Sequence, residues 1–261
     1  MIKEMLKASF IGLVLSQIVV LALISSLVSN FQPLPTVQQL DAAENVSESL
    51  PISLQKTSKK SRESSVALAT LNMVSGEVSF ASGTYIEYRG DLFILTAAHA
   101  VQEAGAVMMV VTPNQQYSCG GIVYYSKQSD IAIIEAPDIP ERRPVDITKS
   151  IPSYNKWKRS LQALDRVVYT GYPNATGPMT VHGHIMGFLE GVLYVNMYAW
   201  SGASGSGVFD EHGNIIGIVS ALEVGDFGPV QIPLHSSIIV RPTYLVDWEQ
   251  AFKDYYEKEE E

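Results

Sequence analysis

The stretch WSGASGSGVFD, residues 200–210, places Ser204 between Gly202 and Gly205. Glycine next to a serine permits an unusual backbone conformation and lets a ligand approach the main chain closely. The N–H groups of Gly202 and Ser204 would then form an oxyanion hole, with the Ser204 hydroxyl presented as a nucleophile. An ordinary loop of small residues has the same composition, so the turn becomes informative only together with partner residues.

Two upstream segments supply residue types that accompany a nucleophilic serine. FILTAAHAV, residues 93–101, predicts a buried strand that ends in small residues and His99. SDIAIIE places Asp130 just before an apolar strand. A histidine can take the serine proton and an aspartate can orient the histidine. The order His99, Asp130, Ser204 excludes the α/β-hydrolases, in which the serine comes first.

These motifs resemble those of the trypsin/chymotrypsin-like serine peptidases, and most closely their bacterial HtrA-like and glutamyl-endopeptidase-like branches. The resemblance spans about residues 68–248 and rests further on ASGTYI (81–86), VVYTGYP (167–173), TVHGHIMG (180–187) and NIIGIVSA (214–221). It implies an all-β fold of two barrels. It also implies a serine endopeptidase that forms an acyl-enzyme intermediate, with His99, Asp130 and Ser204 as its catalytic triad.

The resemblance also implies where a specificity pocket lies. Its walls are expected in two short segments. One contains Tyr198 and Ser201, and the other contains Ser220 and Leu222. These segments carry no charge, which favours a small or medium apolar side chain before the scissile bond. The glutamyl-specific branch carries a histidine where this chain has Val219, so a preference for acidic residues is not supported.

The sequence pattern after residue 65 agrees with an all-β domain. Short apolar runs at residues 108–111, 121–125, 167–172, 192–197 and 215–219 are separated by Gly, Pro and Asn and predict strands. Leu245, Trp248, Phe252 and Tyr255 recur at helical spacing, so we expect a short closing helix.

Composition excludes several classes of function. The net charge of −9 and the absence of a basic stripe argue against nucleic-acid binding. The sequence has no zinc-like Cys/His cluster and no phosphate-binding loop, so we expect a polypeptide substrate and no metal or cofactor. Cys119 is the only cysteine, which excludes an intrachain disulfide.

The N-terminal region predicts a membrane anchor. Residues 8–29 carry no charge and would form a helix of about 33 Å, enough to span a bilayer core of about 30 Å. Lys3 and Lys7 precede this segment, and the next basic residue is Lys56, so residues 1–7 are expected in the cytoplasm and the remainder outside. The alternative is a cleaved secretory signal, which would make the protein secreted.

The remaining divisions follow from composition. Residues 30–65 are rich in Ser, Gln, Glu, Lys and Pro and predict a disordered linker. Residues 66–256 form the expected peptidase domain, and residues 257–261 form an acidic tail. A second hypothesis keeps the fold and the membrane tether but makes the domain a catalytically inactive binding module. Only the geometry of the three candidate catalytic residues separates the two hypotheses.

Overall fold

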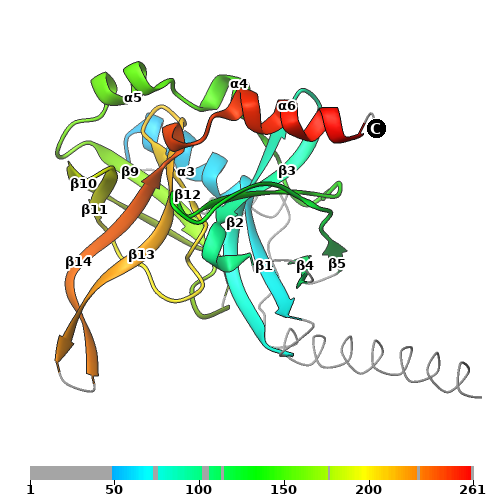
Figure 1. Cartoon of the computed structure of the whole chain (residues 1–261). Helices are drawn as coiled ribbons and strands as arrows, with labels where there is room; N and C mark the ends of the chain where they lie inside the picture. Colours follow the sequence, from blue (N-terminus) through cyan, green and yellow to red (C-terminus); the bar gives the residue numbers. More distant parts are fainter. Residues whose placement is uncertain are drawn as a thin grey trace, which may run out of the picture.

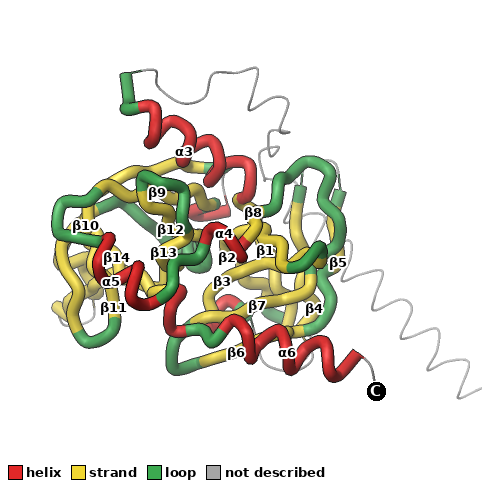
Figure 2. Tube along the Cα trace, turned by 90° about the horizontal axis from the view of Figure 1, so that it is seen from above, coloured by secondary structure: helices red, strands yellow, loops and turns green. Residues whose placement is uncertain are grey.

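The computed structural model of the chain describes residues 49–72, 76–101, 106–112, 115–175, 177–227 and 230–259. Two β-structures lie side by side, and helices run along their edges (Figure 1, Figure 2). The expected transmembrane segment at residues 8–29 lies outside the described residues. Within the described ranges, no helix has the length and apolar character needed to cross a membrane.

The first β-structure is an eight-stranded sheet from the first half of the chain. Its order is β5-β4-β1-β2-β3-β7-β6, and β8 pairs in parallel with β2. The strands are β1 (Ser65–Asn72), β2 (Val78–Tyr88), β3 (Asp91–Ala97), β4 (Ala106–Val111), β5 (Gln116–Ser118), β6 (Ile122–Ser126), β7 (Ile131–Glu135) and β8 (Val145–Asp146).

The second β-structure is a closed antiparallel barrel of order β10-β11-β14-β13-β12-β9. Its β13–β14 hairpin projects well beyond the barrel (Figure 1). The strands are β9 (Arg166–Gly171), β10 (Met179–Leu189), β11 (Val192–Asn196), β12 (Gly207–Asp210), β13 (Ile215–Phe227) and β14 (Val230–Pro242).

The buried apolar residues form two main clusters, and the first also includes Val168, Phe209, Ile215 and Ile218 of the second β-structure. The first core centres on fully buried side chains such as Phe93, Ile94 and Ile133, and the second on Val167, Tyr169 and Val240. The predicted all-β, two-barrel architecture is confirmed, and so are strands at each apolar run singled out in the sequence. The short helical segments are η1 (Ala98–Ala100), α4 (Ile147–Ser150), α5 (Tyr154–Ser160), η2 (Pro173–Ala175) and η3 (Thr243–Leu245).

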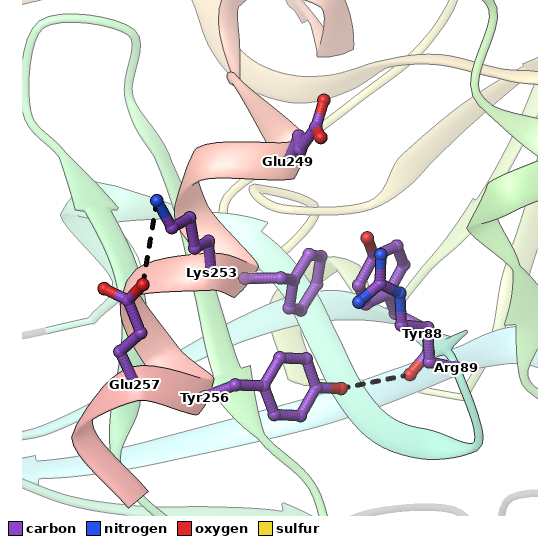
Figure 3. Close-up of a pocket in the computed structure, with 7 residues that line it drawn as sticks. Tyr88, Arg89, Glu249, Lys253, Tyr256 and Glu257 are labelled. Carbon is purple, nitrogen blue, oxygen red and sulfur yellow. Dashed lines mark hydrogen bonds and ion pairs between the residues drawn. The ribbon is translucent and has the colours of Figure 1, made fainter. Parts of the chain in front are cut away.

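The predicted closing helix is α6 (Trp248–Glu259). Phe252 is its anchor: it is 1% exposed, stacks on Tyr88 at 4.1 Å between ring centroids, and packs against Phe93 at 4.9 Å. Tyr256 donates a hydrogen bond to Asp91 at 2.6 Å and so ties the helix to the start of β3. A cavity of about 290 Å³ remains between α6 and the β2–β3 turn (Figure 3).

The linker prediction is wrong at its C-terminal end, because α3 (Ile52–Ser64) is an ordered helix rather than disordered chain. Its inward face is mostly polar: Leu54, Thr57, Ser58, Ser61, Glu63 and Ser64 are buried. Ser61 donates to Thr170 of β9 at 3.0 Å, and Lys60 donates to the Gly213 carbonyl at 2.8 Å. Specific hydrogen bonds therefore hold α3 against the domain. The prediction was based on the lack of apolar periodicity and did not consider such bonds. Residues 30–48 lie outside the described residues.

Leu54→Ala tests whether α3 belongs to the folded domain. Leu54 is 1% exposed and part of the first core, so its truncation should lower the free energy of unfolding by about 2–5 kcal/mol. Ile52 on the same helix is 69% exposed, and Ile52→Ala is the matched control with an expected change within about 0.5 kcal/mol. Chemical unfolding followed by circular dichroism measures both. Equal stability of the two variants would show that α3 does not contribute to the fold.

Candidate active site

His99 and Asp130 meet because of the pairing between β3 and β7. These strands are antiparallel and Ala97 lies opposite Ile131. His99 follows β3 by two residues in the short helix η1, and Asp130 immediately precedes β7, so both emerge at the same edge of the sheet. The Asp130 carbonyl also accepts a hydrogen bond from the Ala98 N–H at 3.1 Å, which fixes η1 on this edge.

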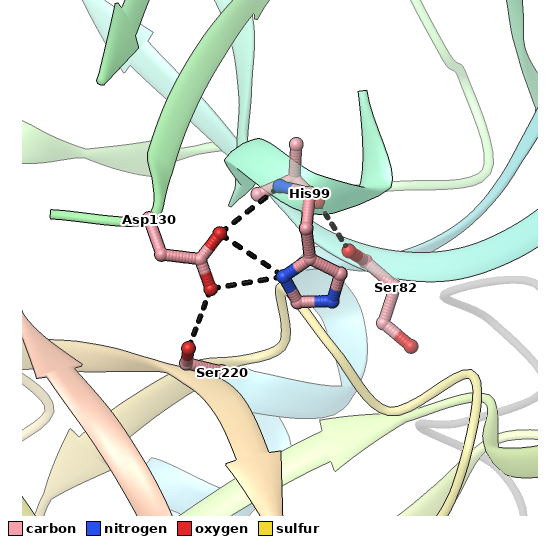
Figure 4. Close-up of polar contacts among 5 residues, drawn as sticks. Ser82, His99, Asp130 and Ser220 are labelled. Atoms are coloured by element: carbon pink, nitrogen blue, oxygen red, sulfur yellow. Dashed lines mark hydrogen bonds and ion pairs between the residues drawn. The ribbon is translucent and has the colours of Figure 1, made fainter. Parts of the chain in front are cut away.

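The Asp130 carboxylate holds the His99 side chain in one orientation (Figure 4). His99 Nδ1 lies 3.0 Å from Oδ1 and 2.9 Å from Oδ2 of Asp130, and the His99 backbone N–H donates to Oδ1 at 3.0 Å. An ionised carboxylate only accepts hydrogen bonds, so Nδ1 carries the proton. In neutral histidine this leaves Nε2 as an acceptor.

Ser220 supplies a further contact to this carboxylate. Its hydroxyl donates to Oδ2 of Asp130 at 2.5 Å. Burial acts to raise the pKa of Asp130, but hydrogen bonds from His99 and Ser220 outweigh it and hold that pKa below its ordinary value. The sequence placed Ser220 in a pocket wall and missed this contact. Ser220 belongs to β13, which packs against β3, the strand that leads to His99.

The turn that carries Ser204 is fixed to the first sheet by Ser82 of β2. The Ser82 N–H donates to the Ser204 carbonyl at 2.8 Å, and the Ser82 hydroxyl donates to the Gly202 carbonyl at 2.7 Å. The same hydroxyl accepts the Tyr172 N–H at 2.8 Å, and Thr96 donates to the Ser82 carbonyl at 2.7 Å. Ser82 therefore connects both barrels at the site. It lay within the quoted ASGTYI motif, but its role was not predicted.

Gly205 sets the distance between this turn and the strand that leads to His99. Its φ is +87°, a region that favours glycine. A Cβ atom here would lie 2.2 Å from the Ser82 carbonyl oxygen and 2.9 Å from the Ala97 nitrogen. The turn thus lies directly against the end of β3, two residues before His99.

The backbone of the Ser204 turn leaves two donors unused. Gly202 has φ +93°, and the Ser201 carbonyl is turned away to accept the Asn174 N–H at 2.6 Å. Within the described part of the chain, neither the Gly202 nor the Ser204 N–H donates a hydrogen bond. The Ser204 side chain is half-buried, and no hydrogen bond joins it to His99 among the described residues. Catalytic hydrogen bonds are often long before substrate binds.

The predicted pocket residues have different surroundings. Tyr198 is 55% exposed, and its carbonyl accepts a hydrogen bond from the Tyr169 hydroxyl at 2.6 Å. Ser201 is exposed. Leu222 belongs to β13, but its side chain lies outside the described part of the structure. The part they play in recognition stays a prediction.

Comparison with known proteins shows the family of the chain. A family model described as the trypsin-like peptidase domain matches residues 81–218, more than half of the chain. The chain belongs to the trypsin-like serine peptidases. Members of this family are endopeptidases, so the protein is a hydrolase that acts on peptide bonds. No curated protein matches it.

Solved structures of bacterial proteases share the fold. The active form of the Rv3671c protease from M. tuberculosis has 18% identity and a TM-score of 0.57, over 72% of this chain and 79% of that one. A serine endoprotease from Yersinia pestis has 20% identity and a TM-score of 0.58, over 78% and 68%. The HtrA-type protease AlgW with a tripeptide has 19% identity and a TM-score of 0.57, over 75% and 61%.

Gly205→Ala tests the close approach of the two barrels at the site. The added methyl group would collide with backbone atoms of β2 and β3 and force a strained φ, so we expect a loss of about 2–4 kcal/mol of stability together with loss of activity. Gly191 has φ +79° but no atom within 4 Å of its Cβ position, so Gly191→Ala should cost only about 1 kcal/mol. Chemical unfolding and peptide hydrolysis measure the difference. A fully active Gly205→Ala enzyme would contradict the close approach.

Proposed function

We propose that the protein hydrolyses peptide bonds with Ser204 as nucleophile, His99 as general base and Asp130 as the residue that orients the histidine. The observation that carries this proposal is the pair of hydrogen bonds from His99 Nδ1 to the Asp130 carboxylate, made where Ser82 fixes the Ser204 turn. Each residue type is in the role that its chemistry permits.

The chemistry follows from these contacts. Nε2 of His99 takes the proton of the Ser204 hydroxyl as its oxygen attacks the carbonyl carbon of the substrate. Negative charge develops on the carbonyl oxygen, and the unused N–H groups of Gly202 and Ser204 stabilise it. His99 then protonates the leaving amine. A water molecule, activated by His99, hydrolyses the acyl-enzyme and regenerates Ser204.

We propose further that Tyr198, Ser201, Ser220 and Leu222 contribute to substrate binding, with a small or medium apolar side chain preferred before the scissile bond. Ser220 has a double role in this proposal, because its hydroxyl is held by Asp130 while its backbone borders the site. A peptide library with one varied position measures the preference.

A fluorophosphonate probe tests the triad, because it reacts with an activated serine. Ser204→Ala should abolish labelling and lower turnover by about 10⁶-fold, and His99→Ala should be nearly as damaging. Ser206 is the matched control: it is fully buried and its hydroxyl donates to the Ala203 carbonyl at 2.7 Å. Ser206→Ala should keep its labelling. If Ser206→Ala is inactive and Ser204→Ala is active, the assignment of the nucleophile is wrong.

A catalytically inactive binding module on the same fold is the second candidate. The observation in its favour is that Ser204 and His99 share no hydrogen bond among the described residues. The same probe decides between the two. Wild-type protein that binds a peptide but is never labelled would support the binding module.

We also propose that residues 8–29 hold the protein in a membrane, with the peptidase domain, residues 66–256, outside the cytoplasm. The support is the uncharged apolar segment after Lys3 and Lys7. A cleaved signal, with secretion of the remainder, is the alternative.

Leu15→Arg combined with Val20→Arg should move the protein from the membrane to the soluble fraction. Each arginine near the centre of the bilayer costs about 2.5–3.5 kcal/mol of insertion free energy. Fractionation of cells by ultracentrifugation measures the change. N-terminal sequencing of the wild-type protein is the accompanying measurement, and a mature chain that starts just after Ser29 would exclude the anchor.

A further inference from the structure

Exposed apolar and basic side chains gather on the second barrel, where α5 lies against β10. The apolar members are Tyr154, Leu164, Met186, Phe188 and Leu189, which are 49%, 78%, 53%, 50% and 60% exposed. The basic members are Lys156, Lys158 and Arg159, all exposed on α5. We call this set the α5–β10 patch. It is not used by the site described above.

Aromatic contacts join the two sides of the patch. Trp157, the buried residue of α5, contacts Phe188 of β10 at 5.3 Å and Tyr244 at 4.8 Å between ring centroids. Tyr154 contacts Tyr244 at 4.9 Å. The Trp157 Nε1–H donates to the Ile216 carbonyl at 2.9 Å and anchors α5 to the barrel. Tyr154 and Phe188 are therefore the exposed ends of one aromatic cluster.

Backbone hydrogen bonds bring Leu164 to the same surface. Its N–H donates to the Ile185 carbonyl at 2.8 Å, and the Ile185 N–H donates to the Asp165 carbonyl at 2.9 Å. Leu164 has φ +74°. This turn places the most exposed large apolar residue of the described chain beside Met186. Met186, Phe188 and Leu189 are all exposed within the last four residues of β10.

The basic part of the patch stands out in an acidic protein. The chain has a net charge of −9, yet residues 153–164 contain Lys156, Lys158 and Arg159 and no acidic residue. None of the three pairs with a carboxylate within the described part of the chain. Lys158 lies 6.0 Å from the centroid of the Tyr154 ring, and Arg159 donates to the Asn155 carbonyl at 3.0 Å. Their charges are available to an anionic partner.

We propose that the α5–β10 patch binds the surface of a membrane that contains anionic lipids. Lysine and arginine heads at this surface reach lipid phosphates, while exposed Leu and Phe side chains enter the boundary between headgroups and acyl chains. Free polyanions offer charge but no apolar layer for Leu164, Phe188 and Leu189. The mixture of unpaired basic groups with exposed aliphatic and aromatic side chains thus fits a lipid surface better than a nucleic acid.

The test uses the full chain with Leu15→Arg and Val20→Arg, so that residues 8–29 do not contribute, and measures co-sedimentation with phospholipid vesicles. This protein should bind vesicles of phosphatidylcholine with phosphatidylglycerol more tightly than vesicles of phosphatidylcholine alone. When Lys156→Gln and Lys158→Gln are introduced into this protein, its binding to the anionic vesicles should weaken about 25-fold, since each basic charge contributes about fivefold to the affinity. Added Leu164→Asn and Leu189→Ser should also weaken it.

The matched control is Lys56→Gln with Lys127→Gln, which removes the same charge at exposed positions outside the patch. It should leave vesicle binding unchanged. Equal loss in the two lysine pairs, or equal binding to both kinds of vesicle, would overturn the proposal. Tighter binding of an RNA oligonucleotide that depends on Lys156 and Lys158 would also overturn it. Fluorophosphonate labelling of Ser204 is measured separately, so failure of the triad and failure of the patch are distinguishable.

Discussion

Ser82 is the residue on which the arrangement of the site depends. It is fully buried in β2, and its backbone and hydroxyl groups bond to Ser204, Gly202, Tyr172 and Thr96. Two of these partners belong to the Ser204 turn, one follows β9 of the second barrel, and one lies in β3 of the first. The buried Ser82 hydroxyl donates one hydrogen bond and accepts another, so its hydrogen-bonding groups are satisfied. If either barrel moved away, one of these buried groups would lose its partner, which costs free energy. The relative position of the barrels and the position of Ser204 are thus set by the same hydrogen bonds.

Three residues at the same place have a positive φ. Asp130 has φ +54°, which is uncommon for a residue other than glycine, and Gly202 and Gly205 have φ +93° and +87°. Hydrogen bonds from the backbone and ring of His99 and from Ser220 hold the Asp130 carboxylate in place. At Gly205 the absence of a side chain lets the turn lie against β3. The Gly202 and Ser204 N–H groups donate to no partner among the described residues, and such an arrangement suits the proposed stabilisation of a developing charge.

The fold could be predicted because apolar periodicity and glycine-rich turns determine it. The strands and the closing helix follow from patterns visible in the chain, whereas the two-barrel arrangement and the grouping of His99 with Asp130 follow from the resemblance to the serine peptidases. What the sequence did not reveal depends on polar contacts between distant segments. α3 buries Ser and Thr side chains through partners more than a hundred residues away, such as Thr170, so its sequence looks like a solvated linker. Ser220 was assigned to a pocket wall, and Ser82 lay within a motif quoted only for the family resemblance. Nothing in the local sequence shows which carboxylate or carbonyl group a hydroxyl will bond. Residues 8–29 lie outside the described structure, so the anchor rests on the sequence alone.

The hydrogen bonds of α3 extend to the site. Ser61 bonds to Thr170 in β9, and two residues later the Tyr172 N–H donates to Ser82. The Tyr172 hydroxyl lies 3.2 Å from the Ser65 hydroxyl and donates to the Ser65 carbonyl at 3.3 Å, at the junction of α3 and β1. One chain of contacts therefore runs from the first described helix through β9 to the residue that fixes the Ser204 turn. Among the described residues, α3 is therefore part of the folded domain, bonded to β9 and continuous with β1. Tyr172 thus bonds both to Ser65, where α3 meets β1, and to Ser82, which fixes the Ser204 turn.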